Sequence, residues 1–296
     1  MIVSDQPTFA SQTPVRVASV ALAVRDLESV ARFYENVLCL ERIDQLDEGV
    51  RLGVAGAPLL ELEHRPEAAP DDPAQAGLFH TAFLMPTRAD LARWLARYSE
   101  LSLPLDGASD HLVSEAIYLS DPEGNGIEVY ADRPPETWRW REDGLAMGTY
   151  PLDLRDLLSA ALPGPSDYAA APTGMRLGHI HLRVGDLAAA ERFYADLLGL
   201  RVTVRVPGAT FLSSGGYHHH IGANTWRSAG TGLRDPHRAG LARIVLEVHA
   251  SELLAICERL LTAGVSVSEK NGRVSFQDSW GTHLELIAVD DPGAPA

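Results

Sequence analysis

Residues 16–40 read RVASVALAVRDLESVARFYENVLCL, and residues 176–200 read RLGHIHLRVGDLAAAERFYADLLGL. The two stretches align without a gap at an offset of 160, since residue 16 matches residue 176. Each begins with a strand-like alternation and continues, after an Asp at an N-cap position, with apolar residues at helical spacing. The shared order of elements indicates a duplicated unit.

Further repeats extend the duplication to two units in each half. Residues 77–80 match 240–243 at an offset of 163, and residues 121–128 match 278–285 at an offset of 157. Each unit reads as a strand, a helix and further strands. We therefore predict an α+β fold of duplicated domains, with four βαβββ units that form two half-open barrels.

The unit boundaries divide the chain into three parts. We expect an N-terminal domain at 14–132, a proline-rich linker at 133–174 and a C-terminal domain at 175–290. Each barrel is predicted to use the two units of its own half. Trp138 and Trp140 indicate that part of the linker packs against a domain.

Composition limits the classes of partner. The chain has 296 residues, enough for about two domains of ~150 residues. Its 25 Lys and Arg against 40 Asp and Glu give a net charge of −15, which disfavours nucleic acid and anionic membranes as partners. No apolar stretch reaches the ~20 residues that span a bilayer, and no signal-peptide pattern is visible. With only Cys39 and Cys257, no disulfide framework is expected, so we predict a cytoplasmic protein and leave a homodimer open.

Equivalent positions on the first and last strands of each unit are expected to point into a barrel. In the C-terminal half these positions hold His179, His220, Arg243 and Glu285. In the N-terminal half they hold Ser19, Glu61, His80 and Glu128. Imidazole and carboxylate ligands with an open coordination position suit Fe(II), Mn(II), Zn(II) or Ni(II), and two His with one carboxylate form a facial triad. Both halves are therefore candidates for a metal site.

The histidine run at 218–220 offers further candidates. On a predicted strand at 217–222, His218 and His220 share one face and His219 takes the other. His220 would complete a centre with His179 and Glu285. The candidates for an acid/base are His218, His219 and His181, and the candidates for a substrate-binding wall are Tyr217, Asn224, Trp226 and Arg243.

Structural roles compete with these assignments. Arg243 and Glu285 can form an ion pair inside a barrel, and a two-pronged bond between them would disfavour a metal there. In the N-terminal half, His111 is a candidate third ligand beside His80 and Glu128. We favour the C-terminal half as the site by a small margin.

The motifs resemble a known superfamily. The DL…FY…LGL or LCL spacing is similar to the vicinal oxygen chelate superfamily, which includes glyoxalase I, bleomycin-resistance proteins and extradiol dioxygenases. The segments GASDHLVSEAIYLSDPEGNGIEVYADRP (107–134) and GGYHHHIGANTW (215–226) resemble its two-domain, catechol 2,3-dioxygenase-like branch. The resemblance places His179 at the first metal-ligand position. The chain departs from the ring-cleaving pattern at Arg243, where that pattern has a ligand His, and Ser19 likewise stands at a position open to a His.

The resemblance implies three alternative functions. The leading hypothesis is a metal-dependent extradiol dioxygenase that uses Fe(II) and dioxygen to cleave a small aromatic vicinal diol. A glyoxalase-like isomerase or lyase would need the same chelation but no oxygen, with Glu285 or Glu128 as the base. A protein that binds a drug or aromatic compound without turnover would need no metal, and Arg243 and Ser19 favour this reading.

Overall fold

The computed structural model describes residues 8–161 and 168–291. After a short 3-10 helix, η1 (Phe9–Gln12), the four predicted units follow in order. Unit 1 contains β1 (Val15–Val24), α1 (Leu27–Val37), β2 (Glu41–Leu46), β3 (Gly49–Val54) and β4 (Ala57–His64). Unit 2 contains β5 (Gly77–Leu84), α2 (Arg88–Glu100), β6 (Gly107–Asp110), β7 (Ser114–Ser120) and β8 (Gly126–Asp132).

The second half repeats this order after the linker. The linker contains η2 (Pro135–Thr137), β9 (Trp140–Arg141), β10 (Gly144–Leu145), β11 (Tyr150–Pro151) and α3 (Leu154–Ser159). Unit 3 contains β12 (Arg176–Arg183), α4 (Leu187–Glu191), the π-helix η3 (Arg192–Leu197), β13 (Arg201–Val206), β14 (Ala209–Ser213) and β15 (Ile221–Asn224). Unit 4 contains β16 (Gly240–His249), α5 (Ala250–Thr262), β17 (Ser268–Lys270), β18 (Arg273–Gln277) and β19 (His283–Val289).

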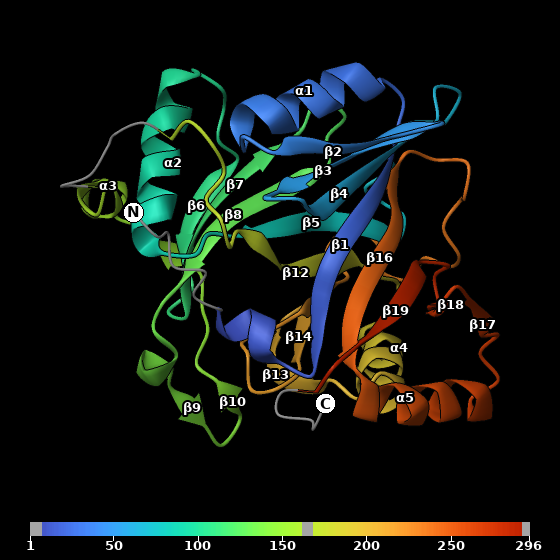
Figure 1. Ribbon diagram of the computed structural model, residues 1–296. Helices are drawn as coiled ribbons and strands as arrows, with labels where there is room; N and C mark the ends of the chain where they lie inside the picture. Colours follow the sequence, from blue (N-terminus) through green and yellow to red (C-terminus); the bar gives the residue numbers. More distant parts are fainter. Residues whose placement is uncertain (1–7, 162–167, 292–296) are drawn as a thin grey trace.

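The units pair crosswise into two curved sheets (Figure 1). Sheet I joins units 1 and 4 in the order β17-β18-β19-β16-β1-β4-β3-β2. Sheet II joins units 2 and 3, with a linker strand at its edge, in the order β11-β6-β7-β8-β5-β12-β15-β14-β13. The prediction that each barrel uses the two units of one half is therefore wrong.

The connections between units explain the crossing. Residues 65–76 lead from β4 in sheet I to β5 in sheet II, and residues 225–239 lead from β15 back to β16. The two connections lie side by side, since Ala69 and Arg238 form a parallel bridge. Local periodicity predicts the units but does not specify which first strands pair, because each unit presents β1, β5, β12 or β16 as a free edge.

Helices and turns, in contrast, hold together the two units of each half. The buried Trp94 on α2 donates a hydrogen bond to the Val37 carbonyl at the end of α1, 2.8 Å away. In the C-terminal half, the Arg259 Nε of α5 donates to the Leu197 carbonyl of η3, also at 2.8 Å. Figure 1 shows α1 and α2 together in the upper part of the molecule and α4 and α5 together in the lower part.

Capping explains where several helices begin. The Asp26 carboxylate accepts from the backbone of Ser29 and that of Asp186 from Ala189, so the N-caps expected in the two repeated stretches are confirmed, and Thr87 likewise accepts from the backbone of Asp90 at the start of α2. Helix α5 begins at Ala250, with His249 at its N-cap and no capping side chain.

Two local expectations differ from the structure. The histidine run does not lie on a strand, because Gly215 and Gly216 take positive φ angles of 61° and 81° and interrupt the extended backbone until β15 begins at Ile221. In the linker, Trp138 is buried as expected, whereas Trp140 is exposed. The sequence also permits a short linker helix at 152–162; α3 spans Leu154–Ser159 of this range, and residue 162 lies outside the described residues.

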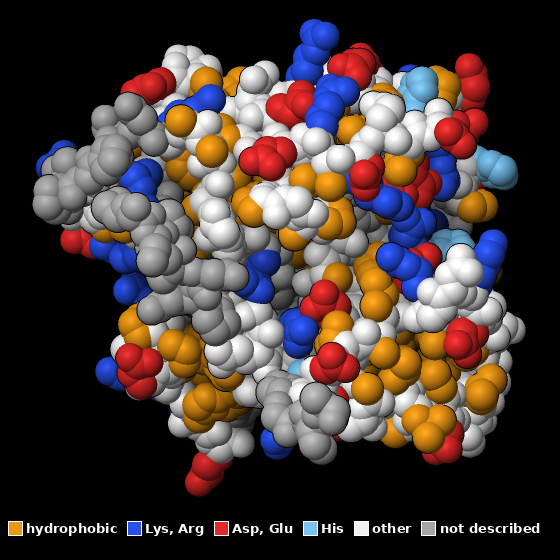
Figure 2. Space-filling model, viewed as in Figure 1, with side chains coloured by type: hydrophobic (Ala, Val, Ile, Leu, Met, Phe, Trp, Pro, Cys, Tyr) orange, Lys and Arg blue, Asp and Glu red, His pale blue; other side chains and the backbone are white. Residues whose placement is uncertain are grey.

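Charges of both signs are mixed on the surface. On the face shown in Figure 2, acidic and basic side chains lie close to one another and among hydrophobic ones. Within residues 8–161 and 168–291, no helix is both long enough and apolar enough to cross a bilayer.

Candidate metal centre

Three buried side chains converge at the centre of sheet II. His80 lies on β5, Glu128 on β8 and His179 on β12, which are three adjacent strands. The Oε2 atom of Glu128 is 3.0 Å from the Nε2 atom of His80 and 3.1 Å from that of His179. The candidate ligand atoms all lie within 4.8 Å of one another. His80 and Glu128 thus come together as predicted, but with His179 as their third partner.

Strand register accounts for this convergence. Ala82 on β5 pairs with Glu128 on one side and with His179 on the other. His80 precedes Ala82 by two residues and shares its face of the sheet, because side chains alternate along a strand. The crosswise pairing of units 2 and 3 is therefore what brings the two halves' ligands to one point.

The chemistry of this triad fits a bound metal. The Nδ1 atom of His179 is buried and has no hydrogen-bond partner among the described residues. No Lys or Arg within the described ranges forms an ion pair with Glu128, although an isolated buried carboxylate is costly. Two imidazoles and a carboxylate, with the remaining positions open, are the ligand set of non-haem Fe(II) sites.

The protonation states also match those of metal ligands. Burial lowers the pKa of His179 to about 4, so its imidazole is neutral near pH 7 and keeps a free lone pair. Burial raises the pKa of Glu128, but the attraction and hydrogen bond of His179 outweigh burial, and the pKa lies well below its usual value. The carboxylate is therefore ionised.

A cavity of about 550 Å³ opens onto His80 and Glu128. Its aromatic wall contains Phe79, whose ring lies 5.2 Å from that of Trp226 and 5.0 Å from that of His181. Phe211 and Tyr118 also line the cavity. The wall is shaped for a flat apolar ligand beside the triad.

The predicted acid/base residues take three different places. His181 lines the cavity, and its buried Nε2 atom has no partner among the described residues. His219 also lines the cavity, with its ring 3.9 Å from that of His179. His218 lies behind His219, fully buried, and its Nδ1 atom is 2.8 Å from the Nδ1 atom of His219.

The predicted centre at His179, His220 and Glu285 does not form. His220 hydrogen-bonds Thr13 at 3.0 Å and the Ser214 backbone at 3.2 Å, and burial lowers its pKa to about 3. Since both ring nitrogens are occupied by protein groups, His220 is a core residue. Glu285 lies on β19 in sheet I, whereas His179 lies in sheet II, so the crosswise pairing separates them.

Arg243 also belongs to sheet I and lines no part of the cavity, which corrects its assignment to substrate binding. Its guanidinium bonds Glu61 at 2.8 Å and Glu63 at 3.3 Å, and its Nε atom lies 3.5 Å from Glu285. The predicted proximity of Arg243 to Glu285 is confirmed. The contact is shared among three carboxylates rather than two-pronged, and Arg273 binds Glu285 at 2.9 Å.

Of the remaining predicted wall residues, only Trp226 lines the cavity. Tyr217 is fully buried and hydrogen-bonds the Tyr130 hydroxyl at 2.7 Å. Asn224 is buried and accepts from the Trp226 backbone at 3.3 Å. Neither residue therefore reaches the cavity. Tyr217 points inward because it lies on the irregular 214–220 segment rather than on a strand.

Tyr118 lines the cavity although it was not among the predicted site residues, and His111 is not the third metal ligand. The Tyr118 hydroxyl is 2.6 Å from His111 Nε2, and His111 Nδ1 is 2.7 Å from the Gly148 carbonyl, so His111 has no nitrogen left for a metal. Tyr118 stands opposite Glu128 in the β7–β8 hairpin. Counting outward from the Asp121–Asn125 turn would have found this pair.

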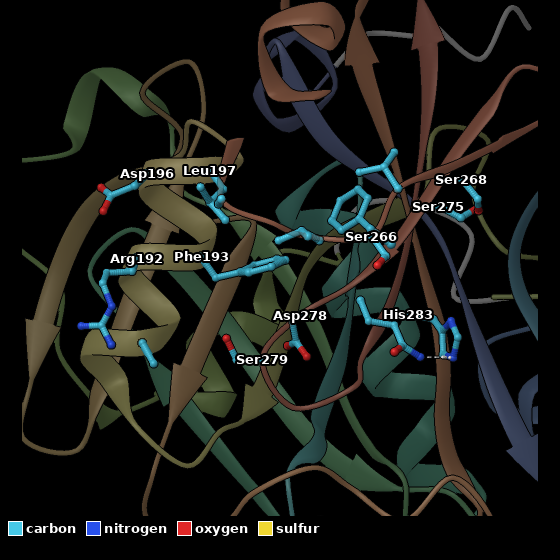
Figure 3. A pocket seen from close by; sticks show the side chains of 16 residues that line it. Arg192, Phe193, Asp196, Leu197, Ser266, Ser268, Ser275, Asp278, Ser279 and His283 are labelled. Carbon is cyan, nitrogen blue, oxygen red and sulfur yellow. Dashed lines mark hydrogen bonds between the residues drawn. The ribbon is translucent and has the colours of Figure 1, made fainter. Parts of the chain in front are cut away.

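A second hollow, of about 830 Å³, lies between η3 and the β18 edge of sheet I (Figure 3). Phe193 points into it, and Gln277 bonds His283 at 2.7 Å across its wall. In the part of the chain that the structure describes, a cluster with metal-binding geometry occurs only at His80, Glu128 and His179. The candidate metal centre therefore lies at the smaller cavity, not at this hollow.

Known proteins are similar in sequence to this chain. Residues 16–129 and 176–293 match the model of the Glyoxalase/Bleomycin resistance protein/Dioxygenase superfamily. The chain belongs to this superfamily. It is 39% identical over 263 residues to the catechol-2,3-dioxygenase of Bacillus subtilis (strain 168), covering 87% of this chain and 91% of that protein. It is 26% identical over 168 residues to biphenyl-2,3-diol 1,2-dioxygenase 3 of Rhodococcus globerulus, covering 50% of this chain and 84% of that protein.

Solved structures of superfamily members share the architecture. A putative dioxygenase from Bacillus subtilis aligns with a TM-score of 0.62 at 15% identity, over 95% of this chain and 87% of that chain. Glyoxalase I from Zea mays aligns with a TM-score of 0.57 at 15% identity, over 96% and 95% of the two chains. At this identity the alignments support the fold alone.

Proposed function

We propose that this protein is an extradiol dioxygenase that cleaves the ring of a small aromatic vicinal diol, with Fe(II) as its metal. The observation that carries the proposal is the buried triad of His80, Glu128 and His179 at an aromatic-walled cavity. The similarity to a protein named catechol-2,3-dioxygenase, over most of both chains, supports the same reaction class.

Fe(II) is the metal that suits both ligands and reaction. His80, Glu128 and His179 would hold it from three adjacent strands, leaving its remaining positions facing the cavity. When bound, the metal would chelate both diol oxygens, lower the pKa of the diol and keep dioxygen within reach of the substrate. Mn(II) fits the same ligands, whereas Zn(II) and Ni(II) would suit an isomerase better than an oxygenase.

The chain's own residues supply orientation, a dry environment and a proton acceptor. Phe79, Phe211 and Trp226 form apolar walls that hold the aromatic ring and exclude water. His219 faces the cavity beside His179 and is placed to accept a proton from a diol hydroxyl. His181 also lines the cavity, with its ring 4.9 Å from that of His80, and could bond an oxygen of the substrate.

Oxygen consumption with a defined product tests the proposal. Metal-free protein is reconstituted anaerobically with Fe(II), Mn(II), Zn(II) or Ni(II) and mixed with catechol and 3-substituted catechols. We expect oxygen uptake equal to the coloured ring-cleavage product formed, with the highest rate for Fe(II). Conversion of an α-oxoaldehyde hemithioacetal without oxygen uptake would instead indicate a glyoxalase-like enzyme. Tight binding of aromatic compounds without turnover, under any metal, would indicate a binding protein.

A further inference from the structure

A buried hydrogen-bond chain leads from the edge of the site to the face of His219. The Asp132 Oδ1 atom, at the end of β8, lies 2.9 Å from the Nε2 atom of His218. The Nδ1 atom of His218 lies 2.8 Å from the Nδ1 atom of His219. The Tyr217 hydroxyl donates to the same Asp132 oxygen at 3.2 Å. His218 is fully buried, so water does not compete for either of its ring nitrogens.

Hydrogen-bond chemistry fixes the direction of each bond in this chain. A carboxylate only accepts, so the Nε2 atom of His218 must carry the proton that faces Asp132. In a neutral imidazole the other nitrogen is then an acceptor, so His218 Nδ1 accepts and His219 Nδ1 donates. The remaining nitrogen of His219, Nε2, is left with a lone pair.

We propose that Asp132 is a positioning residue that, through His218, selects the tautomer in which His219 presents an unprotonated Nε2 atom to the cavity. This inference rests on the proposed function, because a proton acceptor is useful only beside a substrate hydroxyl. Within the described residues, nothing hydrogen-bonds His219 Nε2, and its ring lines the cavity. In that tautomer the Nδ1 proton of His219 is donated to His218, and the Nε2 lone pair is available as a hydrogen-bond acceptor in the cavity.

The alternative tautomer would defeat the reaction. If His218 carried its proton on Nδ1, it would donate to His219, whose own proton would then sit on Nε2 and face the diol. The site would offer the substrate a donor where it needs an acceptor. The role of Asp132 is therefore to select, through His218, the tautomer of His219 that is protonated on Nδ1.

Nitrogen NMR of histidine-labelled, metal-free protein tests the proposal without turnover. In the wild type we expect His218 to be protonated on Nε2 and His219 on Nδ1. Asp132→Leu has a similar shape but no acceptor, so we expect the His219 signal to change to the Nε2-protonated form or to a mixture. Asp132→Asn keeps an acceptor oxygen. Tyr217→Phe removes the second donor to Asp132 and the partner of the Tyr130 hydroxyl but leaves the bonds between Asp132, His218 and His219, so both variants should keep the wild-type pattern.

Steady-state kinetics of the Fe(II)-loaded protein give the second readout. For Asp132→Leu we expect kcat to fall by ~10- to 100-fold with KM changed less than ~3-fold, because a positioned base contributes to the transition state more than to binding. Asp132→Asn should lose less than Asp132→Leu. A wild-type His219 protonated on Nε2, or a His218 protonated on both nitrogens, would overturn the proposal even if no variant folds. Absence of oxygen uptake by the wild type would instead refute the proposed function and leave the tautomer result intact.

Discussion

The centres of sheets I and II are equivalent positions of one scaffold with opposite chemistry. His80 in sheet II corresponds to Arg243 in sheet I. His80 pairs with His181 of β12, and Arg243 pairs with Ala21 of β1, which is the residue equivalent to His181 at the offset of 160. Glu128 corresponds to Glu285, and each lies on the last strand of its unit, beside the first strand that holds His80 or Arg243. Sheet II thus has a buried carboxylate with two imidazoles, whereas sheet I has a carboxylate with a guanidinium.

The remaining positions continue this contrast. His179 in sheet II corresponds to Ser19 in sheet I, and Gly222 corresponds to Glu61. Gly222 leaves room for the His181 ring, since a Cβ atom there would lie 2.9 Å from it. The fold therefore brings side chains together at the centre of each sheet. The residues in sheet II suit a bound metal, whereas those in sheet I include Arg243, whose guanidinium is the cation there.

The largest contrast is expected for the two equivalent glutamates. Glu128→Gln removes the anionic ligand of the proposed metal, so we expect metal content to be lost and kcat/KM to fall by more than ~100-fold. Glu285→Gln changes the same position of sheet I and should keep both metal content and activity. Elemental analysis and oxygen uptake of the two variants provide the measurement. Equal losses in both variants would contradict the assignment of the site to sheet II alone.

Removing the internal cation of sheet I should affect stability rather than catalysis. Arg243→Met leaves Glu61, Glu63 and Glu285 facing one another without Arg243, so we expect ~2 kcal/mol less unfolding free energy in a denaturant titration.

Arg205→Met provides the matched control for that variant. Arg205 pairs with Glu191 at an exposed position, and its loss should cost ~0.5 kcal/mol or less. If Arg243→Met were as stable as Arg205→Met, the guanidinium would not act as the cation of sheet I.

The smallest expected difference concerns the bonds that dock the units of each half. Tyr194 donates to the buried Asp278 at 2.8 Å, whereas the equivalent Tyr34 lies 3.4 Å from Asp121. We expect Tyr194→Phe to lower the unfolding free energy by ~1–2 kcal/mol and Tyr34→Phe by about half as much. Denaturant titrations at one pH compare them. A larger loss for Tyr34→Phe would show that the longer bond is the stronger one.

The contrast also explains what the sequence could predict. The repeats predict the four units, and the offsets of 163 and 157 identify His80 and Glu128 as inward residues of equivalent strands. The repeats cannot predict that His179 completes the triad. That depends on β5 pairing with β12, which follows from the paths of the connections 65–76 and 225–239 and not from any local sequence pattern. The choice of His220 failed for a local reason, since Gly215 and Gly216 break the extended backbone and β15 begins only at Ile221, after the histidine run. Asp132 acquires a role only once the irregular segment brings His218 against it.

Anomalous diffraction from crystals of Fe(II)-reconstituted protein would locate the metal. We expect one strong peak per chain, at the iron edge, between His80, Glu128 and His179 in sheet II, with no peak beside Arg243 and Glu285. A peak in sheet I, or full reconstitution without any peak in sheet II, would contradict the assignment of the site to sheet II.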